Sequence, residues 1–438
     1  MTALARPRFE RAEFMKIARK ALEREFDPTH NLVGPPPFFP PPSLGYAWVL
    51  LDDGSAAARA RAETILTTVL SSQEVRPGHP DYGHFRMCFL DPGIADLNAV
   101  QLFLIELIPI AKLFGNRLSS NIRNALRTSI RAGLQALDNI AAHLTYSNVV
   151  VLDVANRILG GEFLRDADAI ACGVAKLDDF LTYTNRHGGF RDYNSPTYLG
   201  QMLSTVATLA NHTADPLTVK KAEMIQERLW LQAATHYHRG LAQFAGPYCR
   251  AYPPDVLGAS GQMKSLLYGF IDEERLLGDG AGLDRMSGFS AFHLATRGYY
   301  VPDYVLQLIA GTAYPTAIHE GAERDSGLAL TSHLGVSHAL GTAAKGFGSQ
   351  ARNLIVHAAS RASATPKVLF SRYLAHGDPL DLNTFDERLA EWGHFAGIQS
   401  GTRAIALYGA RLDYRKIDWL GVELFLLGAE EQDAVWCA

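Results

Sequence analysis

The chain has 438 residues, of which 47% are hydrophobic and 20% are charged, and its formal net charge is -4 at pH 7. This length and composition predict a globular protein with a large core and two or three domains. Because the sequence has no excess of basic residues, we exclude nucleic acid as a partner. The four cysteines lie far apart and include no C-x-x-C pair, which argues against a disulfide scaffold and against a thiolate zinc site.

Neither a secretory signal nor a membrane span is predicted. The first residues, MTALARPRFERAEF, are charged and contain no apolar run. The most apolar stretch, AVQLFLIELIPIAKLF (99–114), is short for a span and contains Glu106, Pro109 and Lys112, so we interpret it as a buried core helix. We therefore expect a cytoplasmic protein without a membrane partner. The sequence does not indicate the oligomeric state.

Residues 1–312 are predicted to form the first domain, which is helical. Apolar residues recur at helical spacing in RLSSNIRNALRTSIRAGLQALDNIAAHL (117–144). NVVVLDVANRILGGEF (148–163) is apolar on every side, and we expect Gly160 and Gly161 to end its helix. Helices of these two kinds alternate along the chain, which favours a double-layered (α/α) toroid of helical hairpins.

Two other segments have a different composition. GPPPFFPPPSLGY (34–46) contains six prolines, so we expect an extended N-terminal arm whose Phe38 and Phe39 pack on the body. In residues 313–438, short β-rich runs are separated by Gly, Asp, Asn and Pro, and TRAIALYGARLDY (402–414) alternates between two faces. This pattern predicts a smaller antiparallel β region, a sandwich, which could be incomplete in this chain.

The stretch HGGFRDYNSPTYLG (187–200) combines many polar and ionisable side chains in few residues. Its two glycines permit a tight turn, and Ser195 with Pro196 predicts the start of the next helix. The polar side chains held on the loop between them are Arg191, Asp192, Tyr193 and Asn194. Loops on a rigid scaffold commonly carry binding groups, although the same residues could simply cap helices and pack between them.

A second loop, AGPYCRAYPPD (245–255), places Arg250, Tyr252 and Asp255 between prolines. These side chains could face the same cleft as the first loop. Alternatively, an ion pair between Arg250 and Asp255 could pin the loop, and such pairs are common and weak at a surface.

Four further residues near these loops carry polar side chains that could border a cleft. His236 and His238 are two residues apart, and on a helix they diverge, so we expect no metal site and only one of them facing a cleft. His319 and Glu320 lie at the expected domain junction, where solvated linker residues are the preferred interpretation. The sequence contains no complete phosphate loop and no nucleophile elbow, and we expect no cofactor.

A helical ring followed by a β-sandwich resembles the architecture of the α/α-toroid polysaccharide lyases, the broad group of alginate, chondroitin and heparin lyases. Three blocks also look like segments of uncharacterised proteins with this helical core: HLTYSNVVVLDVANRIL, GGFRDYNSPTYLG and FAGPYCRAYPPD. The resemblance implies a carbon–oxygen lyase that cleaves an acidic, uronate-containing oligosaccharide or glycoside by β-elimination.

Such an elimination needs a group that neutralises the substrate carboxylate, a base for the C5 proton and a proton donor for the leaving oxygen. In the lyases that the chain resembles, an asparagine precedes a histidine, and a tyrosine follows soon after. By this order, Asn148 would be the neutraliser and His187 the base or its helper. Tyr193 or Tyr198 would be the proton carrier. Arg250 or Arg191 could complete the carboxylate clamp. The candidates for substrate binding are Arg191, Asp192, Asn194, His236, His238, Tyr252 and Asp255.

Two alternatives to the lyase remain open from the residues. A glycoside hydrolase could use two carboxylates, Asp192 with Asp255 or Glu273, whose separation would decide the mechanism. In the third interpretation, the helical domain is a carbohydrate-binding or biosynthetic scaffold without cleavage chemistry. The expected partner of the lyase is an acidic carbohydrate or a small-molecule glycoside, although an apolar substrate that undergoes elimination or isomerisation is also compatible with the residues.

Overall fold

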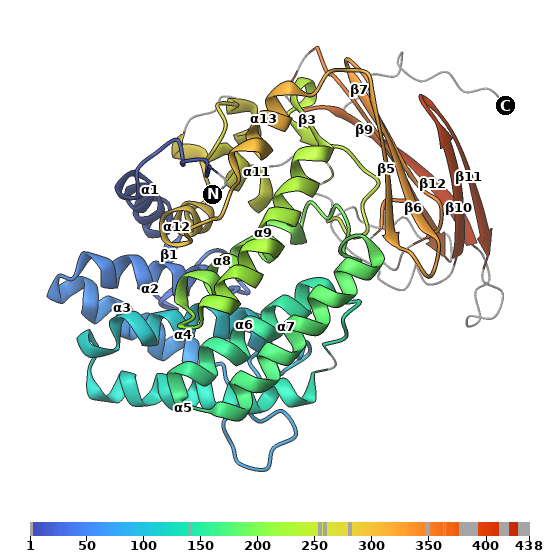
Figure 1. Ribbon diagram of the computed structural model, residues 1–438. Coiled ribbons are helices and arrows are strands. Elements are labelled where there is room, and N and C mark those ends of the chain that lie inside the picture. The colour runs from blue at the N-terminus through green and yellow to red at the C-terminus, as the bar shows by residue number, and fades with distance from the viewer. Residues whose placement is uncertain are drawn as a thin grey trace.

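The computed structural model describes residues 3–140, 142–252, 256, 261–278, 283–346, 351–361, 363, 365–375, 393–410 and 420–427. In these residues the chain is mainly α-helical, and a set of antiparallel strands follows the helices (Figure 1). The last helix ends at Gly311 and the first strand of the large sheet begins at Thr316. The strands lie beside the helical part, so the two parts meet along one side of the molecule (Figure 1).

Most of the helices form two layers. Their bounds are α1 (Arg11–Arg24), α2 (Pro41–Asp53), α3 (Ala56–Leu70), α4 (Ala99–Phe114), α5 (Ser120–Ala136), α6 (Ser147–Leu164), α7 (Ala167–His187), α8 (Tyr198–His212), α9 (Pro216–His236), α11 (Gln262–Tyr268), α12 (Gly288–Thr296) and α13 (Asp303–Gly311). Helices α2, α4, α6 and α8 pack on one another in that order and are buried on nearly every side. Helices α3, α5, α7 and α9 cover them, each packed on its neighbour in the chain.

Close helix packing explains why one expected helix end is wrong. Helix α6 continues through Gly160 and Gly161 and ends at Leu164, where Arg165 adopts a left-handed φ of 62°. A Cβ at residue 160 would lie 3.0 Å from the side chain of Leu134. A Cβ at residue 161 would lie 2.8 Å from that of Ile170. The glycines therefore serve close contact between helices, and this packing outweighs their poor helix propensity.

The proline-rich arm is only partly as expected. The side chain of Phe38 is 1% exposed and packs in the core, whereas Phe39 is 39% exposed. The arm is also shorter than expected, because Pro41 and Pro42 form the first turn of α2. Proline is tolerated there because the first helical N–H groups have no partner within the helix.

One helix, Ala99–Arg117, is long and apolar enough to cross a membrane by length and composition. In the fold, 72% of its apolar window is buried inside the protein. This burial corresponds to the core helix that the sequence predicts for residues 99–114.

In the described part of the chain, the strands form one large sheet and three hairpins. Their bounds are β1 (Phe26–Asp27), β2 (Leu32–Val33), β3 (Tyr237–His238), β4 (Gln243–Phe244), β5 (Thr316–Glu323), β6 (Leu328–Leu334), β7 (His338–Ala343), β8 (Leu354–Ala358), β9 (Lys367–Ala375), β10 (Gly393–Ser400), β11 (Arg403–Ala410) and β12 (Leu420–Leu427). The large sheet is antiparallel with the order β12-β9-β8-β7-β6-β5. The hairpin of β10 and β11 packs against β7, where Gln399 donates to the carbonyl of Leu340.

Residues 236–252 attach the sheet to the helices. Within this segment Tyr248 forms a β-bridge with Arg352, and the hydroxyl of Ser332 donates to the carbonyl oxygen of Gly246 over 2.6 Å. A Cβ at Gly341 would lie 2.0 Å from that same carbonyl oxygen, so only glycine permits this close approach of the two backbones. The segment is therefore held between the helices and the sheet.

A buried network of polar and charged side chains joins α4 to α12. The Glu106 carboxylate accepts from His293 Nε2 over 3.2 Å and from Arg297 Nη2 over 2.5 Å. Burial alone would raise the pKa of Glu106, but the Arg297 charge and the His293 contacts outweigh it and lower this pKa to about 2. Within the described residues this network satisfies charges that burial would otherwise make costly.

We predict that Glu106→Ala lowers the free energy of unfolding by about 3–5 kcal/mol, because it leaves the buried Arg297 guanidinium without its carboxylate. Urea unfolding at neutral pH measures the change. The control is Asp52→Ala, which breaks a surface pair with Arg11 of 2.8 Å and should cost no more than about 1 kcal/mol. Equal effects of the two substitutions would contradict a stabilising role for the network.

We also predict that the protein loses stability as the pH falls below the ordinary histidine pKa of 6.5. Burial lowers the pKa of His357 to about 3, and burial together with the Arg297 and Lys112 charges lowers that of His212 to about 4. Below pH 6.5 these histidines bind protons in the unfolded chain but stay neutral in the folded protein. Their contribution to the free energy of unfolding is therefore fully present above pH 6.5 and declines towards pH 4. Urea unfolding at a series of pH values tests this, and a constant free energy between pH 7 and 5 would contradict it.

Candidate functional site

The loop between α7 and α8 is fastened to the segment that carries Arg250. The side-chain amide of Asn194 donates to the carbonyl oxygens of Ala245, over 2.6 Å, and Pro247, over 3.1 Å. The Ser195 hydroxyl donates to the carbonyl oxygen of Arg250 over 2.7 Å and accepts from the backbone N–H of Tyr198 over 3.0 Å. Ser195 therefore joins the beginning of α8 to the second loop.

These tethers bring five polar side chains together, which we call the arginine cluster: Tyr146, Asn148, Tyr198, Arg250 and Tyr252. Arg250 donates from Nη1 to Asn148 Oδ1 over 3.2 Å and from Nη2 to the Tyr198 hydroxyl over 2.9 Å. The Tyr198 and Tyr252 hydroxyls lie 2.8 Å apart and share a hydrogen bond. The guanidinium carbon also lies 4.0 Å from the ring centroid of Tyr198 and 5.2 Å from that of Tyr146. Asn148 is 6% exposed, and the four larger side chains are half-buried.

A buried carboxylate holds the backbone of one member of the cluster. Asp192 is 2% exposed and accepts the backbone N–H of Asn148 over 2.9 Å, at the first turn of α6. Its own backbone N–H donates to the Ser147 hydroxyl over 3.4 Å. Burial raises the pKa of Asp192, while the Arg250 charge and the N–H of Asn148 oppose that rise. Asp192 thus holds Asn148 in place and has little contact with solvent.

The electrostatics of the cluster favour an anionic ligand. Burial raises the pKa of Tyr198 far above its ordinary value, although the Arg250 charge opposes this, so the phenol keeps its proton at neutral pH. Burial raises the pKa of Tyr146 as well. Burial alone would lower the pKa of Arg250. The neighbouring Tyr198, Tyr146 and Asp192 outweigh this effect and raise the pKa above its ordinary value, so the guanidinium stays charged. The half-buried cluster therefore presents one fixed positive charge and several hydrogen-bond donors.

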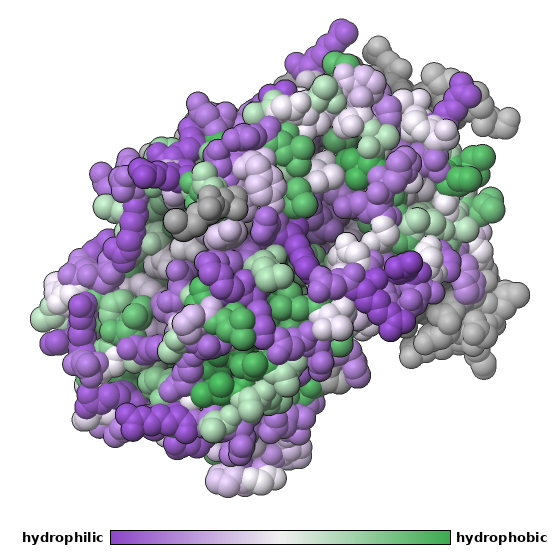
Figure 2. All heavy atoms as spheres, in the orientation of Figure 1, coloured by the Kyte–Doolittle hydropathy of each residue, from purple (hydrophilic) through white to green (hydrophobic). Residues whose placement is uncertain are grey.

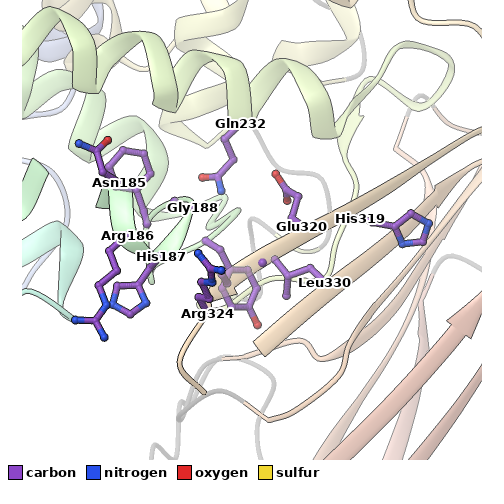
Figure 3. Close-up of a pocket in the computed structure, with 14 residues that line it drawn as sticks. Asn185, Arg186, His187, Gly188, Gln232, His319, Glu320, Arg324 and Leu330 are labelled. Atoms are coloured by element: carbon purple, nitrogen blue, oxygen red, sulfur yellow. The ribbon is translucent and has the colours of Figure 1, made fainter. Parts of the chain in front are cut away.

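A pocket of about 570 Å³ lies where the ends of α7 and α9 meet β5 and β6, and we call it the junction pocket. Among its lining residues are His187, Gly189, Tyr193, Gln232, Glu320 and Arg324. Figure 3 shows Gln232 projecting from α9 and Glu320 projecting from β5, whereas His319 points away from the other lining residues. Hydrophilic residues gather along the seam between the helical part and the sheet (Figure 2).

The structure places His187 and Tyr193 in the junction pocket, whereas Asn148, Tyr198 and Arg250 meet in the arginine cluster. The His187 ring packs 4.4 Å from that of Tyr183, and its Nε2 lies 4.0 Å from Asp325. Tyr193 is 1% exposed, and its backbone carbonyl accepts from the N–H of Cys249 over 3.4 Å. The predicted catalytic residues therefore lie in two neighbouring sites that share one loop.

Several predicted binding residues contact the protein itself. Arg191 lies 3.6 Å from Glu323, and His238 Nε2 lies 2.6 Å from the carbonyl oxygen of Gly335. We therefore give His238, like Asn194, a role in holding the fold. Asp255 lies outside the described residues.

The interpretation of Glu320 as a solvated linker residue is wrong. Glu320 is half-buried on β5 and lies 2.6 Å from His236 Nε2, because the end of α9 packs directly against this strand. Sequence reasoning also missed Tyr146 and Gln232. The position of Tyr146, two residues before Asn148, could have indicated the first, but nothing in the pattern of α9 distinguishes Gln232.

No group of three or more His, Cys, Asp or Glu side chains that could hold a metal occurs in the described part of the chain. His236 and His238 bind different groups, Glu320 and the backbone of Gly335.

We predict that Asn194→Ala lowers the free energy of unfolding by about 1–3 kcal/mol, because two buried carbonyl groups lose their donor. Thermal or urea unfolding measures the loss. The matched control is Asn211→Ala, since the exposed Asn211 also donates to two carbonyl oxygens, those of Ala207 and Gly298, where water can replace it. A similar small loss in both variants would show that the Asn194 tether is not needed.

Comparisons with known proteins give a family without a described function. A family model described as a domain of unknown function (DUF8769) matches residues 42–281. Because the match covers more than half of the chain, the protein belongs to this family. No curated protein matches the sequence. Among solved structures, the chondroitin AC lyase of Streptomyces coelicolor A3, in complex with chondroitin sulphate, is similar with a TM-score of 0.48 and 13% identity. The similarity covers 92% of this chain and 63% of that chain.

Proposed function

We propose that this member of the DUF8769 family is a carbon–oxygen lyase that cleaves an acidic, uronate-containing oligosaccharide or glycoside by β-elimination. The observation that supports the proposal is the arginine cluster, in which one guanidinium contacts both an asparagine amide and a tyrosine hydroxyl. The reaction requires a carboxylate clamp, a base and a proton donor within one site, and a single proton carrier can serve as both base and donor. We also propose that the two helical layers form an (α/α) toroid, of which the packing order α2, α4, α6, α8 is the inner wall.

In the proposed reaction, Arg250 and Asn148 bind the substrate carboxylate. A planar guanidinium matches a carboxylate in geometry as well as charge, and the side-chain amide adds neutral donors. Binding removes the negative charge that otherwise keeps the C5 proton weakly acidic. The same donors then stabilise the enolate-like state that forms as this proton leaves.

Tyr198 carries the proton in this scheme. Tyr198 is a phenol in the resting site, so it first loses its proton to solvent. The resulting phenolate beside the Arg250 charge takes the C5 proton, the C4=C5 double bond forms, the C4–O bond breaks, and the same proton passes to the leaving oxygen, which restores the phenolate. Burial raises the pKa of Tyr198 and disfavours the phenolate, whereas the Arg250 charge opposes this rise in part, so Arg250 is the group that makes the phenolate more accessible. Tyr252, 2.8 Å away, holds the hydroxyl in position. We do not assign the base to His187, since its side chain lies in the junction pocket.

The hydrolase alternative has less support from the geometry. Asp192 is 2% exposed and accepts a backbone N–H, and both carboxylate oxygens of Glu273 accept from Arg275, over 2.8 and 2.6 Å. A pair of carboxylates for acid and base catalysis must both reach the glycosidic bond. These two carboxylates are instead occupied by groups of the protein.

We predict that the protein releases unsaturated products from uronate oligosaccharides and not from the same oligosaccharides after carboxyl reduction. The ultraviolet absorbance of the new conjugated double bond measures turnover. Tyr198→Phe should lower kcat by about 10²-fold or more, because the proton carrier is lost. Asn148→Ala should lower kcat by about 10²–10³-fold, because a donor to the enolate-like state is lost.

The control for these variants is Tyr304→Phe, which removes another hydroxyl, bonded to Glu227 on the helical surface, and should leave turnover unchanged. Full activity in both site variants would overturn the assignment. Reducing ends without the absorbance would favour the hydrolase, and binding of acidic saccharides without any turnover would favour the scaffold.

A further inference from the structure

We infer that the junction pocket is a subsite for an uncharged sugar residue. The inference rests on the proposed function only where it joins this residue to the uronate held by the arginine cluster. The pocket volume of about 570 Å³ lies within the range of about 300–1,000 Å³ that is usual for small-molecule sites. Its walls come from both parts of the fold, the ends of α7 and α9 on one side and β5 and β6 on the other.

The charges around the pocket cancel, which disfavours an ion as the ligand. Arg186 pairs with Asp325 over 2.8 Å, Arg191 lies 3.6 Å from Glu323, and Glu320 is bonded to His236. Three arginines, Arg186, Arg191 and Arg324, lie in or beside the lining of the pocket. Three carboxylates match them in number and lie on β5 and the turn that follows it: Glu320, Glu323 and Asp325. The pocket differs in this respect from the arginine cluster, whose fixed charge is positive.

Buried polar atoms nevertheless call for a ligand that forms hydrogen bonds. Within the described residues, His187 Nδ1 and Gln232 Oε1 are buried without a hydrogen-bond partner, and both side chains line the pocket. His187 is 8% exposed, so its ring is built into the wall. An unsatisfied buried polar atom costs about 1–3 kcal/mol, which a ligand hydroxyl would recover.

Part of the wall is apolar. Phe190, Tyr193, Ala322 and Leu330 are buried residues that line the pocket. A pyranose ring has an apolar face of C–H groups and a rim of hydroxyls, each of which can donate and accept. An uncharged sugar therefore matches the apolar wall, the neutral charge balance and the buried polar atoms at once.

The pocket and the arginine cluster are joined by two short stretches of chain. Tyr193 lines the pocket while Tyr198, five residues later, belongs to the cluster. The carbonyl of Tyr193 accepts from Cys249, the residue before Arg250. A saccharide that places its uronate on Arg250 would therefore present a neighbouring unit to the pocket.

The test is binding of uncharged pyranoses, namely glucose, galactose, mannose and N-acetylglucosamine, to the full chain by saturation-transfer NMR and calorimetry, with glucuronate as the charged comparison. Gly189→Trp fills the pocket without strain, because a Cβ at this position meets nothing within 4 Å and its φ is not in the left-handed region. Gly311→Trp is the matched control, since a Cβ at the end of α13 also meets nothing within 4 Å.

We expect at least one uncharged pyranose to bind to the protein. Gly189→Trp should raise its Kd at least tenfold, and Gln232→Leu should raise it about tenfold. Gly311→Trp should leave the Kd unchanged. Tyr198→Phe should leave this binding unchanged, which separates the pocket from the proposed reaction. No binding of any uncharged pyranose, or binding that Gly189→Trp does not weaken, would overturn the inference even if the elimination is observed. If the protein shows no elimination activity but binds a pyranose, and Gly189→Trp abolishes this binding, the sugar subsite would be supported and the proposed lyase function would be contradicted.

Discussion

The fastening of the α7–α8 loop to residues 245–250 is the constraint on which the rest of the site depends. The Asn194 amide and the Ser195 hydroxyl use backbone carbonyl oxygens of that segment as acceptors. With the two backbones joined in this way, Arg250 contacts the first turns of α6 and α8, where Asn148 and Tyr198 lie. The same segment carries Gly246, whose carbonyl accepts from Ser332 in the sheet. The site, the helical layers and the sheet are therefore held by one set of contacts.

Burial separates the charged groups that stabilise the fold from those available for binding. The contacts of Ser204, His293 and Glu106 form a chain like a nucleophile, a base and its orienting carboxylate, with separations of 3.1 and 3.2 Å. These three residues are only 3–5% exposed, and Arg297 adds a charge that neutralises the carboxylate. Arg250 has comparable partners, but it and its tyrosines remain half-buried. The network around Glu106 is therefore structural, because it is buried. The arginine cluster is a candidate site, because solvent reaches it.

The sequence predicts some levels of this organisation better than others. Alternating apolar patterns predict two helical layers followed by antiparallel strands, because burial of an apolar face leaves a periodic trace. The gathering of Asn148, Tyr198 and Arg250 follows from their places at or near helix ends and in loops. The pairing of Glu320 with His236, 84 residues apart, leaves no such trace. Likewise, Asn194 donates to backbone carbonyl oxygens. Every residue type has such a carbonyl, so the sequence does not indicate which residues are the acceptors. Gly160 and Gly161 look like a helix end, because the Leu134 and Ile170 side chains that they accommodate come from other helices.

The two neighbouring sites differ in charge in a way that a mixed saccharide would require. The arginine cluster concentrates a positive charge beside protonated phenols, which favours a carboxylate and offers little to a neutral ring. In the junction pocket, paired charges and an apolar wall leave hydrogen bonds as the basis of selectivity. Because one loop of the helical part enters both, a ligand that fills the pocket would also order the residues leading to Tyr198. Binding energy from an uncharged unit would then help to position the uronate for reaction, which is how contacts remote from the reacting atoms contribute to turnover.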